Sequence, residues 1–328
     1  MTERLTMTEN RSRQTRALLF QRLRRWEASG ILLALIILSG ALALMSPNFL
    51  TLTNIPILLR NASFVGLVAL GETLVILVGG IDLSVGTGAG LSAIIGALML
   101  TKFGLHPFLA LPLSLVFGLA LGLVNGLLVA KLRLNPFIVT LASGEMFAGA
   151  ILVITQGYPV RPLGSPFKMF GQTEIYGLPL PFLIFLACGL GLWFVLARTR
   201  FGRDIYAVGG NRDAATLVGI RVGRVEMAVF GLAGMFAALA GMLYASRMDA
   251  AQPTVGEGWM LSAITAAILG GTSLRGGEGA IVGTMFGALL LTVLQNGTVL
   301  LNVSGYWERV IIGGVVLAAV LVDRLRRR

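Results

Sequence analysis

Residues 198–224 read RTRFGRDIYAVGGNRDAATLVGIRVGR and form the only long polar interruption between hydrophobic segments that is also strongly basic. Inside it, the pattern predicts a short helix after Asn211, whose side-chain oxygen can accept an N–H of the first turn. Asp213 falls in that turn, where negative charge suits the helix dipole, and Gly219 can supply the left-handed residue that ends the helix. A short helix on the cytosolic side of a membrane protein offers a contact to a soluble partner, so we interpret it as a docking helix.

The composition of the chain indicates a membrane protein. Hydrophobic residues make up 56% of the sequence and charged residues 12%, and the mean hydropathy is +0.85, whereas a soluble domain carries about 25% charged residues. The net charge of +11 would suit nucleic acid, but the basic residues lie between and beyond long apolar runs, which is typical of the positive-inside rule. We therefore expect a lipid bilayer and no nucleic acid as the partner. With one cysteine and one histidine in the chain, we expect no disulfide framework, no metal site and no cofactor.

Apolar runs of spanning length predict about ten transmembrane helices. A spanning helix needs about 20 residues, and turn signals such as Gly79-Gly80, His106-Pro107 and Asn135-Pro136 separate the runs. The expected spans are 27–45, 60–80, 86–101, 108–130, 136–155, 178–197, 225–246, 258–271, 279–301 and 307–323. The predicted fold class is an all-α polytopic membrane protein.

Charge divides the chain into a basic tail (1–26), a transmembrane domain (27–323) with the loop 198–224, and a basic end (324–328). If both termini are cytosolic, 20 of the 26 lysines and arginines lie inside and six outside, as the positive-inside rule requires. The triplet Ala41-Leu42-Ala43 resembles a signal-peptide cleavage site, but the long basic tail before the first apolar run favours an uncleaved span.

Two glycine-rich segments indicate an internal repeat. Val78–Leu98 and Leu269–Leu289 align without gaps at an offset of 191 residues and share glycines, alanine and leucine at eight positions. Frequent Gly and Ala give such matches by chance, whereas the functional alternative is a duplicated unit of the kind that transporters carry. The glycine-rich parts, 79–90 and 270–279, suit either simple turns or re-entrant segments.

Ionisable residues at membrane depth are candidate pathway or gating groups, because they are costly there and usually functional. Asp82 and Ser84 follow a Gly-Gly turn and either cap the next helix or act in gating or coupling. Glu72 and Glu145 lie nearer the middle of spans, where they either hydrogen-bond between helices or line the pathway.

Three segments resemble the signatures of ribose-type sugar ABC transporter permeases, a part of the branched-chain amino acid/ribose permease superfamily. They read GETLVILVGGIDLSVG (71–86), FGRDIYAVGGNRDAATLVGI (201–220) and AQPTVGEGWMLSAITAAILGGTSLRGGEGAIVGTMFGAL (251–289). The similarity runs from about residue 47 to the C-terminus. It implies a permease subunit of a bacterial inner-membrane importer for a monosaccharide or similar polyol. The implied partners are a cytosolic ABC ATPase subunit, a periplasmic sugar-binding protein and a second permease copy or paralogue.

The loop 198–224 is the obvious contact for that ATPase. The chain has no GxxxxGK[ST] phosphate-binding loop, so it is not expected to be an enzyme and a partner must hydrolyse ATP. Leu217 and Val218 would seat the short helix in a groove, with Arg212 and Asp213 at the rim. The alternative is a solvated inside loop. The candidate docking residues are Phe201, Gly202, Arg203, Gly209, Gly210, Asn211, Arg212, Asp213, Ala214, Ala215, Leu217 and Gly219.

Uncharged polar residues and one ring complete the pathway candidates. The amides suit sugar hydroxyls but also serve as interhelical hydrogen-bonding groups, and Trp259 is among the few rings that can stack on a sugar. These amides are Asn125, Gln295 and Asn296. The family often has acidic residues where this chain reads Trp-Met-Leu-Ser (259–262), and an uncharged residue at Glu72, which leaves the sugar open.

Two other classes of protein compete with this interpretation. An ion-coupled secondary transporter would also have ten apolar helices and internal repeats, but it would carry a buried relay of acids. The chain offers only three acids for such a relay, which are Glu72, Asp82 and Glu145. A membrane-embedded enzyme would need a nucleophile with a base or a metal cluster, and the chain lacks the residues for either.

Overall fold

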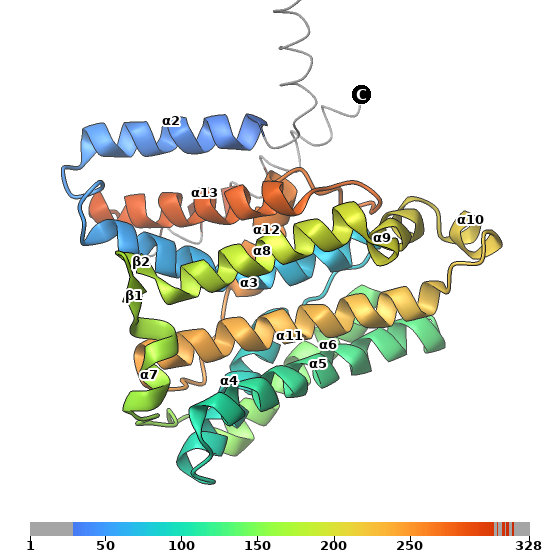
Figure 1. The fold of residues 1–328 in the computed structure, drawn as a ribbon, viewed down its shortest axis with the longest axis horizontal. Helices are drawn as coiled ribbons and strands as arrows, with labels where there is room; N and C mark the ends of the chain where they lie inside the picture. The colour runs from blue at the N-terminus through green and yellow to red at the C-terminus, as the bar shows by residue number, and fades with distance from the viewer. Residues whose placement is uncertain (1–28, 305–306, 308–309, 312, 315–316, 318–328) are drawn as a thin grey trace, which may run out of the picture.

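A computed structural model of the chain describes residues 29–304 and, beyond them, 307, 310, 311, 313, 314 and 317. Long helices run roughly along one axis of this part, which confirms the all-α polytopic class (Figure 1). The helices are α2 (Ser29–Met45), α3 (Asn54–Leu77), α4 (Val85–Thr101), α5 (Pro107–Leu132), α6 (Pro136–Thr155), α7 (Ser165–Gln172), α8 (Leu180–Arg198), α9 (Arg200–Gly210), α10 (Arg212–Leu217), α11 (Val222–Met248), α12 (Trp259–Leu269) and α13 (Ile281–Leu300). Strands β1 (Glu174–Ile175) and β2 (Leu178–Pro179) form a small antiparallel pair.

Six of the described helices are long and apolar enough to cross a membrane, namely α3, α5, α6, α8, α11 and α13. Three further expected spans correspond to the shorter apolar helices α2, α4 and α12. Most of the tenth, 307–323, lies outside the described residues, as do the tail 1–26 and the end 324–328. The number of ten spans and the side of each terminus therefore stay predictions.

Helix α3 lies at the centre of the bundle and contacts α8, α11, α12 and α13. Beside it, α5 and α11 pack antiparallel at very close range because glycines on α5 face the α11 backbone. A Cβ atom at Gly118 would lie 2.5 Å from the carbonyl oxygen of Gly234, and one at Gly122 would lie 2.1 Å from that of Phe230. Small residues that let backbones approach in this way are a common means of helix association in membranes.

The expected span 258–271 is helical only over Trp259–Leu269, the helix α12. Its 11 residues have a length of about 16 Å at 1.5 Å per residue, about half the thickness of the hydrocarbon core of a bilayer. The non-helical segment before it packs on the first turns of α4, where a Cβ at Gly90 would lie 2.5 Å from the Val255 carbonyl oxygen. Val255 and Gly256 of this segment are buried against α4, and non-helical backbone is tolerated at membrane depth where protein covers it.

Helices α3 and α12 end in the same type of turn. Gly79 and Gly271 both have left-handed backbones, with φ of +83° and +92°. In each turn the next N–H, of Gly80 or of Thr272, donates to a helix carbonyl five residues back at 2.9 Å. The gapless alignment pairs Gly79 with Gly270, whereas the turn geometry pairs Gly79 with Gly271. The two turns therefore match in geometry, but with a shift of one residue relative to the alignment. The internal repeat stays a prediction.

The two ends of the bundle carry different small elements (Figure 1): α7 with the strand pair at one end, and α9 with α10 at the other. The predicted docking helix is confirmed as a helix, because α10 begins after Asn211, whose Oδ1 accepts from the Ala214 N–H at 2.9 Å. Gly219 has φ +85° beyond its end, as predicted. Helices α7 and α9 were not predicted.

Candidate functional site

Helix α10 presents an apolar tip at the end of the bundle. Leu217 is 88% exposed and Val218 is 76% exposed, whereas Ala215 on the opposite side is buried against the protein. Adjacent large apolar side chains exposed together on a polar loop are typical of protein–protein contact sites. The tip is therefore suited to contact another surface.

An ion pair fixes the orientation of α10. The Arg212 guanidinium donates to both carboxylate oxygens of Glu226 on α11, at 2.5 Å and 3.1 Å. Glu226 is almost completely buried, while half of the Arg212 side chain stays exposed. Planar two-point pairing of this kind restricts geometry more than a single contact does. Arg212 is the residue that the sequence predicts at the rim of a docking surface, whereas Glu226 lies on a different helix and in no motif, so no sequence pattern indicates it.

The candidate docking residues fall into two groups. Phe201, Gly202, Gly209 and Ala215 face the protein rather than solvent, and a Cβ at Gly202 would lie 2.4 Å from the Leu196 carbonyl oxygen. They hold α9 and α10 in place. The exposed group consists of Arg203, Gly210, Asn211, Arg212, Asp213, Ala214, Leu217 and Gly219.

Four of the pathway candidates meet in a buried polar cluster formed by Glu72, Asp82, Ser84 and Asn125. Asp82 Oδ1 accepts from the Ser84 N–H at 2.9 Å and from its hydroxyl at 2.6 Å. Glu72 Oε1 accepts from the Asp82 N–H at 3.1 Å, and Asn125 Nδ2 donates to the Ser84 Oγ at 2.9 Å. All four side chains are at most 3% exposed. Asp82 thus holds the Ser84 residue that precedes α4, but no side chain, neither that of Asp82 nor that of Ser84, accepts from an N–H of the first turn of the helix.

A fifth residue, Thr140 of α6, supports this cluster and was missed by sequence analysis. Its Oγ1 accepts from the Leu83 N–H at 3.0 Å and lies 3.1 Å from the Ile81 carbonyl oxygen. A cavity of about 10 Å³, lined in part by Asp82, Ser84 and Phe147, adjoins the cluster and has space for about one water molecule. The turn 78–84 is thus held by polar contacts from three helices.

The remaining pathway candidates lie elsewhere. Glu145 stands in the middle of α6 with its side chain exposed, and Gln295 is partly exposed on α13. Asn296 forms a reciprocal pair of hydrogen bonds with Asn54 of α3, at 2.9 Å and 2.8 Å, as an interhelical amide would. Trp259 packs against aromatic rings, with its centroid 6.3 Å from that of Phe64 and 5.4 Å from that of Tyr244.

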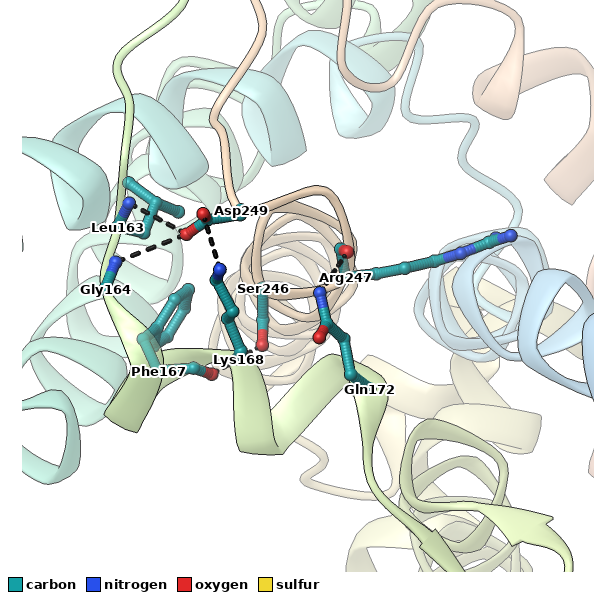
Figure 2. A network of polar contacts seen from close by, with 8 residues as sticks. All are labelled: Leu163, Gly164, Phe167, Lys168, Gln172, Ser246, Arg247 and Asp249. Carbon is teal, nitrogen blue, oxygen red and sulfur yellow. Dashed lines mark hydrogen bonds and ion pairs between the residues drawn. The ribbon is translucent and has the colours of Figure 1, made fainter.

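At the opposite end of the bundle, polar contacts attach α7 to the end of α11 (Figure 2). The Asp249 carboxylate accepts from the Leu163 N–H at 3.0 Å and from the Gly164 N–H at 3.2 Å, and it pairs with Lys168 at 2.8 Å. Two more bonds reach the same turn of α11: the Ser246 hydroxyl donates to the Phe167 carbonyl, and Gln172 to the Arg247 carbonyl. We call these residues the outer clamp.

The outer clamp should resist mild acid. Desolvation alone would raise the pKa of Asp249, but the hydrogen bonds from Lys168, Leu163 and Gly164 outweigh it and hold the pKa below its ordinary 3.8. A depressed carboxylate pKa stabilises the fold at every pH above the ordinary value, and this is lost as pH falls through the folded pKa. Acidification from about pH 7 to about pH 5 should therefore leave the clamp closed.

Hydrogen exchange of residues 163–172 would measure this. Asp249→Ala is expected to speed the exchange at neutral pH, while Glu257→Ala, at an exposed position in the next loop, should leave it unchanged. Exchange in the unsubstituted protein that accelerates at pH 5, after correction for the intrinsic rate, would show that Asp249 is not the group that closes the clamp.

Comparison with known proteins identifies the family of this chain. Residues 54–320 match the family described as "Branched-chain amino acid transport system / permease component". The chain is 46% identical to the ribose import permease protein RbsC of Bacillus subtilis (strain 168), over 90% of this chain and 92% of that protein. It is 42% identical to RbsC of Escherichia coli (strain K12), over 90% and 93%. It is 39% identical to the D-allose transport system permease protein AlsC of Escherichia coli (strain K12), over 92% of each. No solved structure matches the chain.

Proposed function

This chain belongs to the family of branched-chain amino acid transport system permease components, and we propose that its cargo is a monosaccharide or a similar polyol. It is the multi-pass permease subunit of an ATP-driven sugar importer in the bacterial inner membrane. It is not an enzyme, because ATP hydrolysis in such importers belongs to a separate subunit. The observation that carries the sugar assignment is similarity to ribose and allose permeases over at least 90% of the chain.

The contact for the cytosolic ABC ATPase subunit is the exposed tip of α10. This is supported by the exposure of Leu217 and Val218 and by the ion pair between Arg212 and Glu226, which holds the tip in one orientation. A short apolar helix seated in a groove is a common mode of recognition. A pre-oriented helix loses less conformational entropy when it binds.

A second permease copy or paralogue covers the outer face of α6. This proposal is supported by Glu145, which is exposed at the centre of an apolar helix whose exposed neighbours include Leu141, Met146 and Val153. A carboxylate directed at lipid is costly, so such groups generally face another helix or a water-filled cavity. Glu145 of each copy would then face the translocation pathway, where it can accept hydrogen bonds from sugar hydroxyls.

The periplasmic sugar-binding protein docks at the end of the bundle that carries α7. Support comes from an open depression of about 440 Å³ there, with Arg161, Asp249 and Gln252 among its lining residues. The outer clamp keeps this surface in a single shape. At the inner end, the cluster of Asp82, Ser84 and Asn125 is proposed as part of a gate.

Reconstitution in liposomes tests the function. The chain, its ATPase subunit and its binding protein should together transport labelled sugar across the liposome membrane. This transport should require ATP on the side of the membrane that carries the ATPase subunit. Ribose, allose and arabinose would be compared, because permeases for these sugars are among the relatives. Uptake that continues without ATP hydrolysis and collapses with an ion gradient would refute the proposal in favour of a secondary transporter.

A further inference from the structure

Three backbone segments from distant parts of the sequence meet where α9 ends. The Gly277 N–H donates to the carbonyl oxygen of Leu77, the last residue of α3, at 2.9 Å. Gly209 of α9 lies directly on this hydrogen bond. A Cβ atom on Gly209 would be 1.8 Å from the Leu77 oxygen and 2.5 Å from the Gly277 nitrogen. We call this contact the glycine junction.

Neighbouring residues extend the glycine junction without any side chain between the backbones. A Cβ at Gly276 would lie 2.9 Å from the Gly79 nitrogen and 3.0 Å from the Gly209 oxygen. Gly276 also has φ +84°, a conformation that L side chains rarely adopt. The Tyr206 hydroxyl donates to the Gly279 carbonyl at 2.8 Å, which ties α9 to the same turn. Close-packed backbones transmit displacement because they have no soft side chain to absorb it.

The junction lies between the two features to which the proposed function assigns roles. On one side, α9 leads through Asn211 into α10. On the other, Gly79 opens the turn 78–84, which carries Asp82 into the buried polar cluster. The turn at 270–280 connects α12 to α13 and meets α9 at the same point.

We propose that Gly209 and Tyr206 are positioning residues that pass the movement of α10 to both glycine turns, and so couple ATP hydrolysis to the inner gate. A shift of α9 cannot occur at this point without displacing the end of α3 or the turn 270–280. One movement of the docking helix thus acts on both turns at once. The inference rests on the proposed function of an ATP-driven importer.

The number of sugar molecules transported per ATP hydrolysed tests the proposal. A merely structural role would lower the rate of sugar transport and the rate of ATP hydrolysis together and would leave this ratio unchanged. Gly209→Ala places a methyl group on the Leu77 carbonyl, and Tyr206→Phe removes the hydroxyl that donates to Gly279 while it keeps the ring. The matched control is Gly191→Ala on α8, where a Cβ has nothing within 4 Å. All four proteins would be compared as the reconstituted complex with ATPase subunit and binding protein.

Gly209→Ala should lower the transport-to-hydrolysis ratio by about tenfold, within the usual range of coupling between distant sites. Tyr206→Phe should lower it about threefold, as expected for one net hydrogen bond, and Gly191→Ala should not change it. An unchanged ratio in Gly209→Ala overturns the proposal. If Gly209→Ala fails to accumulate in membranes, Tyr206→Phe decides, and an unchanged ratio there overturns it equally. An unsubstituted complex without ATP-dependent uptake would instead refute the proposed function.

Discussion

Leu217→Glu is expected to remove the ATPase subunit from the purified permease. The leucine side chain is 88% exposed at the tip of α10, and burying such a side chain in a partner contributes about 1.5–3 kcal/mol. Glutamate would lose this and would also place a carboxylate without a partner in an apolar groove. The combined change corresponds to at least about a tenfold loss of affinity, since 1.4 kcal/mol is a factor of ten.

Co-purification from native membranes in mild detergent measures this loss. The tagged permease is isolated, and the ATPase subunit is quantified by mass spectrometry relative to the permease. Leu134→Glu is the matched control, because Leu134 is also exposed, at 47%, in a loop predicted to lie on the same side of the membrane. Retention of the ATPase by Leu217→Glu at the level of the unsubstituted protein would exclude α10 as the contact.

A double substitution examines the rim of the same surface. Asp213 lies in the first turn of α10, so Asp213→Arg reverses a charge that suits the helix dipole. Combined with Leu217→Glu, it should leave no detectable ATPase in the preparation. A permease that retains its ATPase after both changes would keep its family membership, while the docking role of the loop would be wrong.

Sequence patterns identified α10 because its signals are local. Asn211 caps the start of the helix and Gly219 lies just beyond its end, and both act on backbone groups within one or two turns. The local sequence is therefore sufficient to predict where this helix begins and ends. Helix α9 is different, since three of its eleven residues are glycines, each costing about 1 kcal/mol in a helix. It forms because Ile205 and Val208 are buried against the rest of the protein. Propensity alone could not predict it.

The candidate site was recovered only in part, for a related reason. Glu72 and Asp82 were predicted as a loose set of intramembrane polar groups, and the structure joins them with Ser84 and Asn125 in one cluster. Their distance from Glu145 could not be predicted, because a spanning helix is apolar on every side and periodicity does not reveal which face is buried. Pairings across the bundle, such as Arg212 with Glu226, leave no mark in either local sequence.

Asp82→Ala is expected to destabilise the permease strongly, whereas Asp82→Asn is expected to be tolerated. Alanine leaves the Ser84 N–H and hydroxyl without their acceptor in a buried place, at about 1–3 kcal/mol for each unsatisfied group. Asparagine keeps an acceptor oxygen for Ser84, while it removes the charge and replaces the second carboxylate oxygen by an NH₂ group. The midpoint of thermal unfolding in detergent should fall by several degrees for Asp82→Ala and stay close to that of the unsubstituted protein for Asp82→Asn.

Sugar uptake by the two variants separates a structural role of Asp82 from gating by charge. If Asp82 acts only as the hydrogen-bond acceptor for Ser84, Asp82→Asn should keep most of the uptake in the reconstituted importer and Asp82→Ala should lose it with stability. If the gate requires an ionised carboxylate, Asp82→Asn should unfold at the normal temperature and yet transport no sugar. We expect the first result, because Asp82 Oδ1 accepts hydrogen bonds from Ser84 and an amide oxygen can accept the same hydrogen bonds. A stable but inactive Asp82→Asn would contradict it and would make charge at this turn part of the transport cycle.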